Sequence, residues 1–130
     1  MREILFRGKA VNLNNGSKDF VFGQYVQNRD GKFICSDTRE NGKQKHQVIE
    51  KTVGQYTGLT DKNGKKIFEG DIVLYTRDEE VGQISYHESE AMFVAEFDTW
   101  FTDFDHLYGK DLEVIGNIHD NPELLKGGAE

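Results

Sequence analysis

The sequence predicts a mainly β protein, a sandwich or barrel built of antiparallel meanders, with one short helix near the C-terminus. Hairpin turns are favoured by Asn-Gly and Asp-Gly pairs, because both residues tolerate a positive φ. Such pairs recur at Asn15-Gly16, Asp30-Gly31, Asn41-Gly42 and Asn63-Gly64. Short runs of strand-forming residues separate them, and helix-start signals are scarce.

The predicted strands are short runs rich in Val, Ile, Phe, Tyr and Thr and bounded by turn residues. In chain order they cover residues 4–11, 20–26, 32–36, 46–59, 65–68, 71–76, 81–86, 91–97 and 112–118. The aromatic stretch 97–112 fits neither the strand period nor the helix period. For that stretch we expect either an irregular loop or a second short helix.

The short helix is predicted at "DNPELLKGG" near the end of the chain. Asn121 can cap it, Pro122 suits its first position and Glu123 complements the helix dipole. Gly127 ends it, and we expect residues 127–130 to fray.

The polar stretch 36–45 is the one plausible seam between domains, because it contains no apolar residue, and we place the boundary just after it. We therefore predict an N-terminal β region over residues 1–47, a β domain over residues 48–126 and a frayed tail over residues 127–130.

The segment "VGQYTGL" (53–59) places Tyr56 on a strand face between Gly54 and Gly58. Glycine weakens a strand and is usually kept where a neighbouring backbone or ring comes close, as at a bend in a barrel. We favour this interpretation. The alternative is a ligand-binding notch beside Tyr56.

The following residues "TDKNGKK" predict a turn with Gly64 in the left-handed conformation. This turn leaves its lysines in solvent, and together with Tyr56 they form a candidate contact surface: Lys62, Lys65 and Lys66. Farther on, Gly70 and Asp71 predict a tight corner at which the Asp71 carboxylate accepts backbone N–H groups.

Charge is distributed unevenly along a chain whose net charge is -7. Residues 1–66 carry 13 Lys and Arg against 7 Asp and Glu, whereas residues 67–130 carry 3 against 16. The C-terminal half contains a candidate acidic face: Glu88, Glu90, Asp98, Asp103 and Asp105. Opposite charges on the two halves indicate a charged partner or complementary surfaces that meet, or else two solvated faces.

The sequence shows no catalytic or metal-binding constellation. Cys35 is the single cysteine, which excludes an intramolecular disulfide and favours a reducing compartment. A metal site would need histidines that converge with carboxylates, and the nearest sets are His87 with Glu88 and Glu90, and His106 with Asp103 and Asp105. Neither set has diagnostic spacing, so we expect neither a cofactor nor an enzyme.

Three blocks of the sequence resemble the YopX family of small phage and prophage proteins of Gram-positive bacteria. The blocks are "MREILFRGKA", "VGQYTGLTDKNGKKIFEGDIV" and "EVIGNIHDNPELL", in the family's order. The resemblance implies a C-terminal SH3-like barrel after a smaller N-terminal β-hairpin region, in a family without an established activity. It brings no catalytic or binding residues.

We expect a cytoplasmic protein, because no apolar run at the N-terminus is long enough for a signal peptide or a membrane span. The resemblance implies that the cell is a bacterial host. The favoured function is a non-enzymatic accessory module that binds a host or phage protein and assembles as a homo-oligomer. One alternative is an acidic mimic of DNA that inhibits a host DNA-binding protein. A nucleic-acid-binding barrel, with Tyr56 or Tyr75 as a stacking platform, ranks last because the net negative charge opposes it.

Overall fold

A computed structural model describes residues 3–11, 20–40, 42–98, 100–103 and 109–129. Within these residues the protein is mainly β, with two antiparallel sheets that do not close, as the sequence predicted for the fold class. The chain divides into two compact units, Met1–Tyr56 and Thr57–Glu130. This division falls later than the boundary predicted after residue 47.

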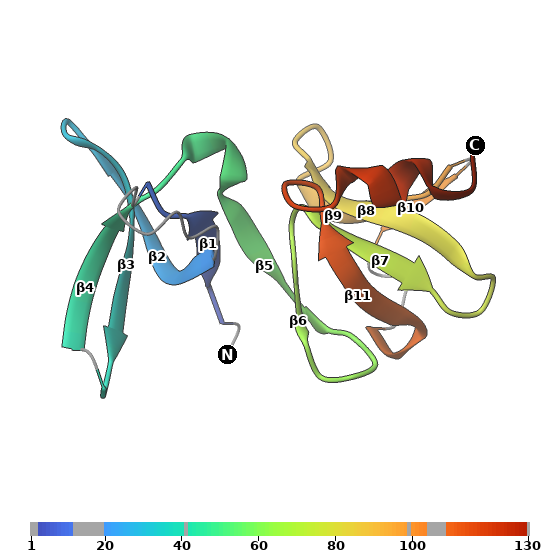
Figure 1. Cartoon of the computed structure of the whole chain (residues 1–130), viewed down its shortest axis with the longest axis horizontal. Helices are drawn as coiled ribbons and strands as arrows, with labels where there is room; N and C mark the ends of the chain where they lie inside the picture. Colours follow the sequence, from blue (N-terminus) through green and yellow to red (C-terminus); the bar gives the residue numbers. More distant parts are fainter. Residues whose placement is uncertain (1–2, 12–19, 41, 99, 104–108, 130) are drawn as a thin grey trace. The chain divides into compact units, whose positions relative to one another are not determined.

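The first unit contains a meander of antiparallel strands, coloured blue to green in Figure 1. Its sheet has the order β4-β3-β2-β1-β5-β6. The strands are β1 (Phe6–Lys9), β2 (Phe20–Asn28), β3 (Gly31–Thr38), β4 (Gly42–Gln47) and β5 (Gly54–Thr60). β5 continues across the boundary between the units, and β6 (Lys66–Phe68) belongs to the second unit.

Two of the predicted hairpin turns are described in this unit. Gly31 and Gly42 have φ angles of 138° and 69°, conformations that glycine adopts without steric cost. Residues 36–38 of the polar stretch end β3, residues 42–45 begin β4, and the two strands pair antiparallel. The Asn15-Gly16 pair lies outside the described residues.

The single strand predicted over residues 46–59 is wrong, because a 3₁₀ turn, η1 (Glu50–Thr52), interrupts it. The buried side chain of Thr52 explains the interruption. Its Oγ1 donates to the carbonyl oxygen of Ile49 at 2.6 Å and accepts from the amide of Lys9 at 2.8 Å. The Thr52 hydroxyl thus satisfies the amide of Lys9 and the carbonyl oxygen of Ile49, which in a continuous strand would need backbone partners.

The second unit is built on a five-stranded sheet with the order β10-β9-β8-β7-β11. Its strands are β7 (Asp71–Tyr75), β8 (Glu80–His87), β9 (Met92–Glu96), β10 (Phe101–Asp103) and β11 (Leu112–Asn117). A bulge between Val114 and Gly116 shifts the register of β11 against β7.

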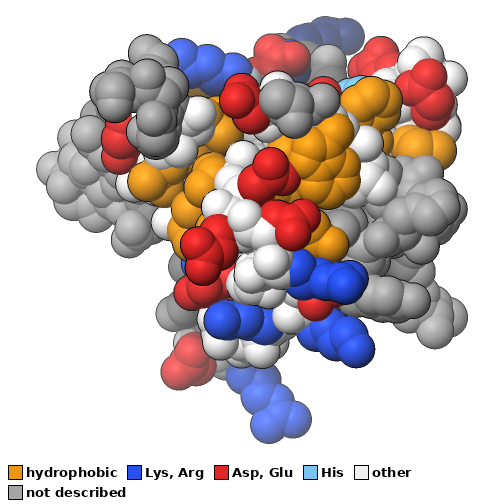
Figure 2. All heavy atoms as spheres, turned by 90° about the vertical axis from the view of Figure 1, so that its right-hand side faces the viewer, with side chains coloured by type: hydrophobic (Ala, Val, Ile, Leu, Met, Phe, Trp, Pro, Cys, Tyr) orange, Lys and Arg blue, Asp and Glu red, His pale blue; other side chains and the backbone are white. Residues whose placement is uncertain are grey.

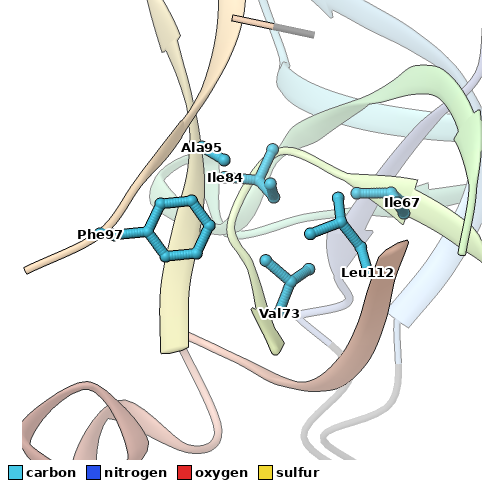
Figure 3. Packing of buried hydrophobic residues seen from close by; sticks show 6 residues of the cluster. All are labelled: Ile67, Val73, Ile84, Ala95, Phe97 and Leu112. Atoms are coloured by element: carbon cyan, nitrogen blue, oxygen red, sulfur yellow. The ribbon is translucent and has the colours of Figure 1, made fainter. Parts of the chain in front are cut away.

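The core of the second unit comes from six buried side chains that point toward one another in Figure 3. They are Ile67, Val73, Ile84, Ala95, Phe97 and Leu112. Trp100 stacks on the ring of Phe97 at 4.6 Å, and Tyr75 contacts both rings. Burial of these apolar and aromatic groups is the main stabilising contribution to this unit.

The segment predicted as a short helix contains a 3₁₀ helix, η3 (Pro122–Ala129), which contacts β8. Asn121 precedes it, and its carbonyl oxygen accepts from the amide of Leu124 at 3.0 Å. The undecided stretch 97–112 contains β10 and a 3₁₀ turn, η2 (Gly109–Asp111), while residues 104–108 lie outside the described part. None of the helices in the described residues is long and apolar enough to cross a membrane.

Candidate functional site

The residues predicted as a contact surface have different environments. Tyr56 is buried, with 9% of its surface exposed, so its ring is not a platform for an incoming base. Lys62, Lys65 and Lys66 are exposed, in and just after the turn that joins β5 to β6. The ammonium of Lys62 lies 3.7 Å from the carboxylate of Glu113.

The conformation of Gly58 explains why a glycine stands in β5. Its φ is 97°, a region that L side chains rarely adopt, and a Cβ added there would meet no atom within 4 Å. A close approach of backbone or ring therefore does not account for Gly58. Gly54, by contrast, is buried where β5 pairs with β1.

The corner at Gly70 and Asp71 has the predicted structure. Gly70 has a φ of 95°, and Asp71 is almost fully buried. The Asp71 Oδ2 accepts from the amide of Phe68 at 2.8 Å, which ties the corner to the end of β6. Asp71 is therefore a structural residue of the second unit.

Asp61 is a second structural carboxylate, which the sequence analysis did not identify. Its Oδ1 accepts from the amides of Asn63 and Lys65, and its Oδ2 from the amide of Val114, each at 2.9 Å. Gly64, with a φ of 84°, completes this turn by donating its amide to the carbonyl oxygen of Asp61. The carboxylate therefore joins the turn before β6 to β11.

The pKa of Asp61 lies below its usual value. Burial acts to raise this pKa, but the N–H donors of Val114, Lys65 and Asn63 and the positive charge of Lys65 together outweigh it. The sequence signal was the aspartate two residues before Asn63-Gly64, a position from which a carboxylate accepts turn amides. No local signal pointed to Val114.

The predicted acidic face is described in part. Glu88 and Glu90 are exposed in the turn between β8 and β9, and Asp98 is exposed after β9. Asp103 belongs to β10, but its side chain lies outside the described part, as does all of Asp105. Figure 2 shows acidic side chains interspersed with hydrophobic ones on one face of the molecule.

Several carboxylates of the acidic half bind groups within the second unit. Glu80 accepts from the indole Nε1 of Trp100 at 2.7 Å. Glu96 lies 2.8 Å from the Nε2 of His87, and Glu90 lies 3.7 Å from the Nδ1 of the same ring. These carboxylates therefore fix side chains of their own unit.

His87 lies at one wall of a hollow of about 430 Å³ on the second unit, which we call the His87 hollow. Phe101 forms another wall, with its ring centroid 5.7 Å from that of His87, and 63% of its surface is exposed. The hollow is lined by His87, Glu90, Met92, Val94, Phe101 and Thr102. It combines apolar surface with a carboxylate at its rim.

The first unit has a surface of opposite character along β4, at the edge of its sheet. Lys43 and Lys45 are exposed and lie on the same face of the strand, opposite Asp37 and Cys35 of β3. The ammonium of Lys45 lies 4.4 Å from the centre of the Phe33 ring. We call the segment Gly42–Gln47 the basic edge.

A hollow of about 560 Å³ adjoins the basic edge in the first unit, and its walls include Ile4, Cys35, Asp37, Lys43 and Lys45. Cys35 is a free, half-buried thiol. In the part of the chain that the structure describes, no group of three or more His, Cys, Asp and Glu side chains could hold a metal ion. The side chains of the set considered around His106 lie outside that part.

Comparisons with known proteins identify the family. The chain matches the family model described as YopX protein over residues 8–126. It is similar to the crystal structure of protein EF1440 from Enterococcus faecalis, with 25% sequence identity and a TM-score of 0.60, over 96% of this chain and 99% of that chain. The comparison with curated proteins gave no match. The chain therefore belongs to the YopX family, as the three sequence blocks indicated.

Proposed function

We propose that this protein is a non-enzymatic binding or assembly module that forms a homo-oligomer through surfaces of opposite charge. The observation that carries the proposal is the contrast between the basic edge and the turn between β8 and β9. The basic edge exposes Lys43 and Lys45 at the end of a sheet, whereas the turn exposes Glu88 and Glu90. Complementary charges steer association and fix the register of an interface.

The basic edge is also suited to assembly by its backbone. A strand at the end of a sheet presents N–H and C=O groups that another strand can pair with, and lysines are common on such edges. Contact between different surfaces of two identical copies produces a ring or an open filament. The function we propose is therefore self-assembly, in which copies of this chain bind one another.

Family membership supports the setting that we propose for this assembly: an accessory role for a phage or prophage in the cytoplasm of a bacterial host. We further propose that the second unit is a variant of an SH3-like barrel. The consecutive antiparallel strands β7, β8, β9 and β10, with β11 returning beside β7, support this description.

The DNA-mimic alternative receives less support. A mimic needs a row of carboxylates directed to solvent, with about one charge per 1.7 Å of duplex axis. Glu80 and Glu96 instead contact Trp100 and His87 of their own unit. The nucleic-acid-binding alternative also loses its stacking platforms, because Tyr56 is buried and Tyr75 packs against aromatic rings of the core.

The test is the mass of the protein in solution, measured by light scattering at low and at high salt. We expect an oligomer at low salt that dissociates as salt rises, because screening weakens contacts between exposed charges. The double variant Lys43→Glu/Lys45→Glu should dissociate at low salt. The matched control, Lys51→Glu/Arg77→Glu, makes the same charge change at exposed positions outside the basic edge and should stay assembled. A wild-type monomer at both salt concentrations would refute the proposal.

A further inference from the structure

The His87 hollow has the chemistry of a receptor for a long cationic side chain. Met92, Val94 and the exposed ring of Phe101 provide apolar and aromatic surface, and Glu90 provides a carboxylate at the rim. Lysine buries its aliphatic stem on apolar surface while its ammonium stays near water and an anion. An ammonium over an aromatic face gains a further cation–π attraction.

The carboxylates around the hollow are held in place before any ligand arrives. Glu90 accepts from the hydroxyl of Ser89 at 2.6 Å and lies near the imidazole of His87, which is itself bonded to Glu96. A carboxylate that is already positioned loses less conformational freedom on binding. His87 therefore lies between Glu90 and Glu96 at one wall of the hollow.

The hollow adjoins a strand edge. Phe101 and Thr102 belong to β10, which stands at one end of the five-stranded sheet in the order of the described strands. An extended segment pairing along β10 would therefore bring its alternate side chains to the hollow. The ligand class that fits is an extended strand with lysines on one face.

We propose that the occupant of the His87 hollow is Lys43 in the basic edge of a second copy of this chain. This inference rests on the self-assembly proposed above and names the residues that meet. Lys43 and Lys45 share one face of β4 about 7 Å apart, the repeat of alternate residues in a strand. Lys45 already lies over the Phe33 ring of its own copy, so Lys43 is the lysine that enters the hollow.

In this contact, the aliphatic stem of Lys43 lies against Phe101 and Met92 and its ammonium pairs with Glu90. The backbones of β4 and β10 supply hydrogen bonds between the two copies. The two surfaces differ and the contact is head-to-tail, so a pair of copies keeps one free basic edge and one free hollow for further copies.

The experiment measures self-association by sedimentation, with two charge-reversal variants studied alone and as an equimolar mixture. Lys43→Glu removes the inserted side chain but keeps the hollow, whereas Glu90→Lys alters the hollow but keeps the inserted side chain. Each variant alone should self-associate at least about tenfold more weakly than the wild type, the size of effect measured for close charge pairs at interfaces. The mixture should form a complex, because each variant supplies the surface that the other has lost.

The matched control is Glu88→Lys, which makes the same charge change in the same exposed turn at a residue that does not line the hollow. It should weaken association much less than Glu90→Lys. Phe101→Ser is a second, uncharged probe, and it should weaken association without altering the thermal unfolding of the monomer, because most of that ring is exposed.

The outcomes separate this inference from the proposed function. A wild-type oligomer that is weakened equally by Glu88→Lys and Glu90→Lys, or a mixture that stays unassociated, would overturn the Lys43 assignment and leave charge-driven assembly standing. A wild-type monomer would overturn both. A wild-type oligomer together with a one-to-one complex in the mixture would support both.

Discussion

Replacing Asp61 by asparagine should destabilise the second unit without altering its surface shape. In the structure the Asp61 carboxylate accepts three backbone N–H groups, and the amide of Val114 comes from a residue 53 positions away. Asparagine keeps one acceptor oxygen for the turn amides. Its NH₂ group then faces the amide of Val114, so two donors oppose each other where a charged hydrogen bond stood.

The expected loss of stability follows from the hydrogen bonds that the Asp61 carboxylate accepts. Hydrogen bonds to charged groups contribute about 1.5–3 kcal/mol each, and a buried donor left unsatisfied costs about 1–3 kcal/mol. Because Asp61 is 5% exposed, water cannot fully replace the lost acceptor. We expect Asp61→Asn to lower the free energy of unfolding by about 2–4 kcal/mol, a large fraction of the 5–15 kcal/mol typical of a domain.

The assay is urea unfolding followed by fluorescence, since Trp100 is the single tryptophan and packs against the core of the second unit. Asp98→Asn is the matched control, with the same chemical change at an exposed position of the same unit. Equal midpoints for Asp61→Asn and Asp98→Asn would show that the bond to Val114 contributes little.

The contribution of Asp61 should also depend on pH in a defined direction. The pKa of Asp61 is lower in the folded protein than its usual value of 3.8, so the ionised carboxylate stabilises the fold. This stabilisation is fully present above the unfolded pKa and is lost as the pH falls through the folded one. The stability difference between wild type and Asp61→Asn should therefore be constant near neutral pH and shrink below about pH 4. A difference that grew on acidification would contradict the assigned direction.

Three further substitutions test a packing contact, a backbone conformation and a hydrogen bond of the second unit. Gly82→Ala should destabilise by about 1–3 kcal/mol, because its Cβ would lie 2.6 Å from the ring of Phe97, and a drop in thermal midpoint measures this. Gly58→Ala should cost about 1–2 kcal/mol through backbone strain alone, so circular dichroism should show an unchanged fold with a lower midpoint. Trp100→Phe removes the 2.7 Å bond to Glu80 and should lower the free energy of unfolding by about 1–3 kcal/mol, measured by circular dichroism in urea because the variant has no tryptophan; an unchanged midpoint would mean that water replaces the indole donor.

Local rules predicted the parts of the fold that depend on neighbouring residues. The turn at Gly64 and the corner at Asp71 were predicted because their signals span a few residues, and turn chemistry acts over that distance. The class of the fold followed from the same turns. The η1 turn was missed because the Thr52 hydroxyl accepts from Lys9, a bond that only the folded chain forms.

The candidate site was less predictable, because its residues also meet only in the folded chain. The sequence indicated acidic and basic surfaces and named Glu90, but it gave no reason to select Lys43, Phe101 or Glu96. His87 meets Glu96 because β8 pairs with β9 in a particular register, and Phe101 reaches the same place from β10. Strand register is set by the whole sheet, so spacing along the chain could not reveal this cluster.

The continuity of β5 constrains how the protein can be cut into fragments. The boundary between the compact units falls after Tyr56, inside a strand that runs from Gly54 to Thr60. If the gene were split at that boundary, the first fragment would end with half of this strand and the second would begin with the other half. Backbone N–H and C=O groups of both halves would lose hydrogen-bond partners. Fragments for separate expression should therefore overlap, each retaining the whole of residues 54–60.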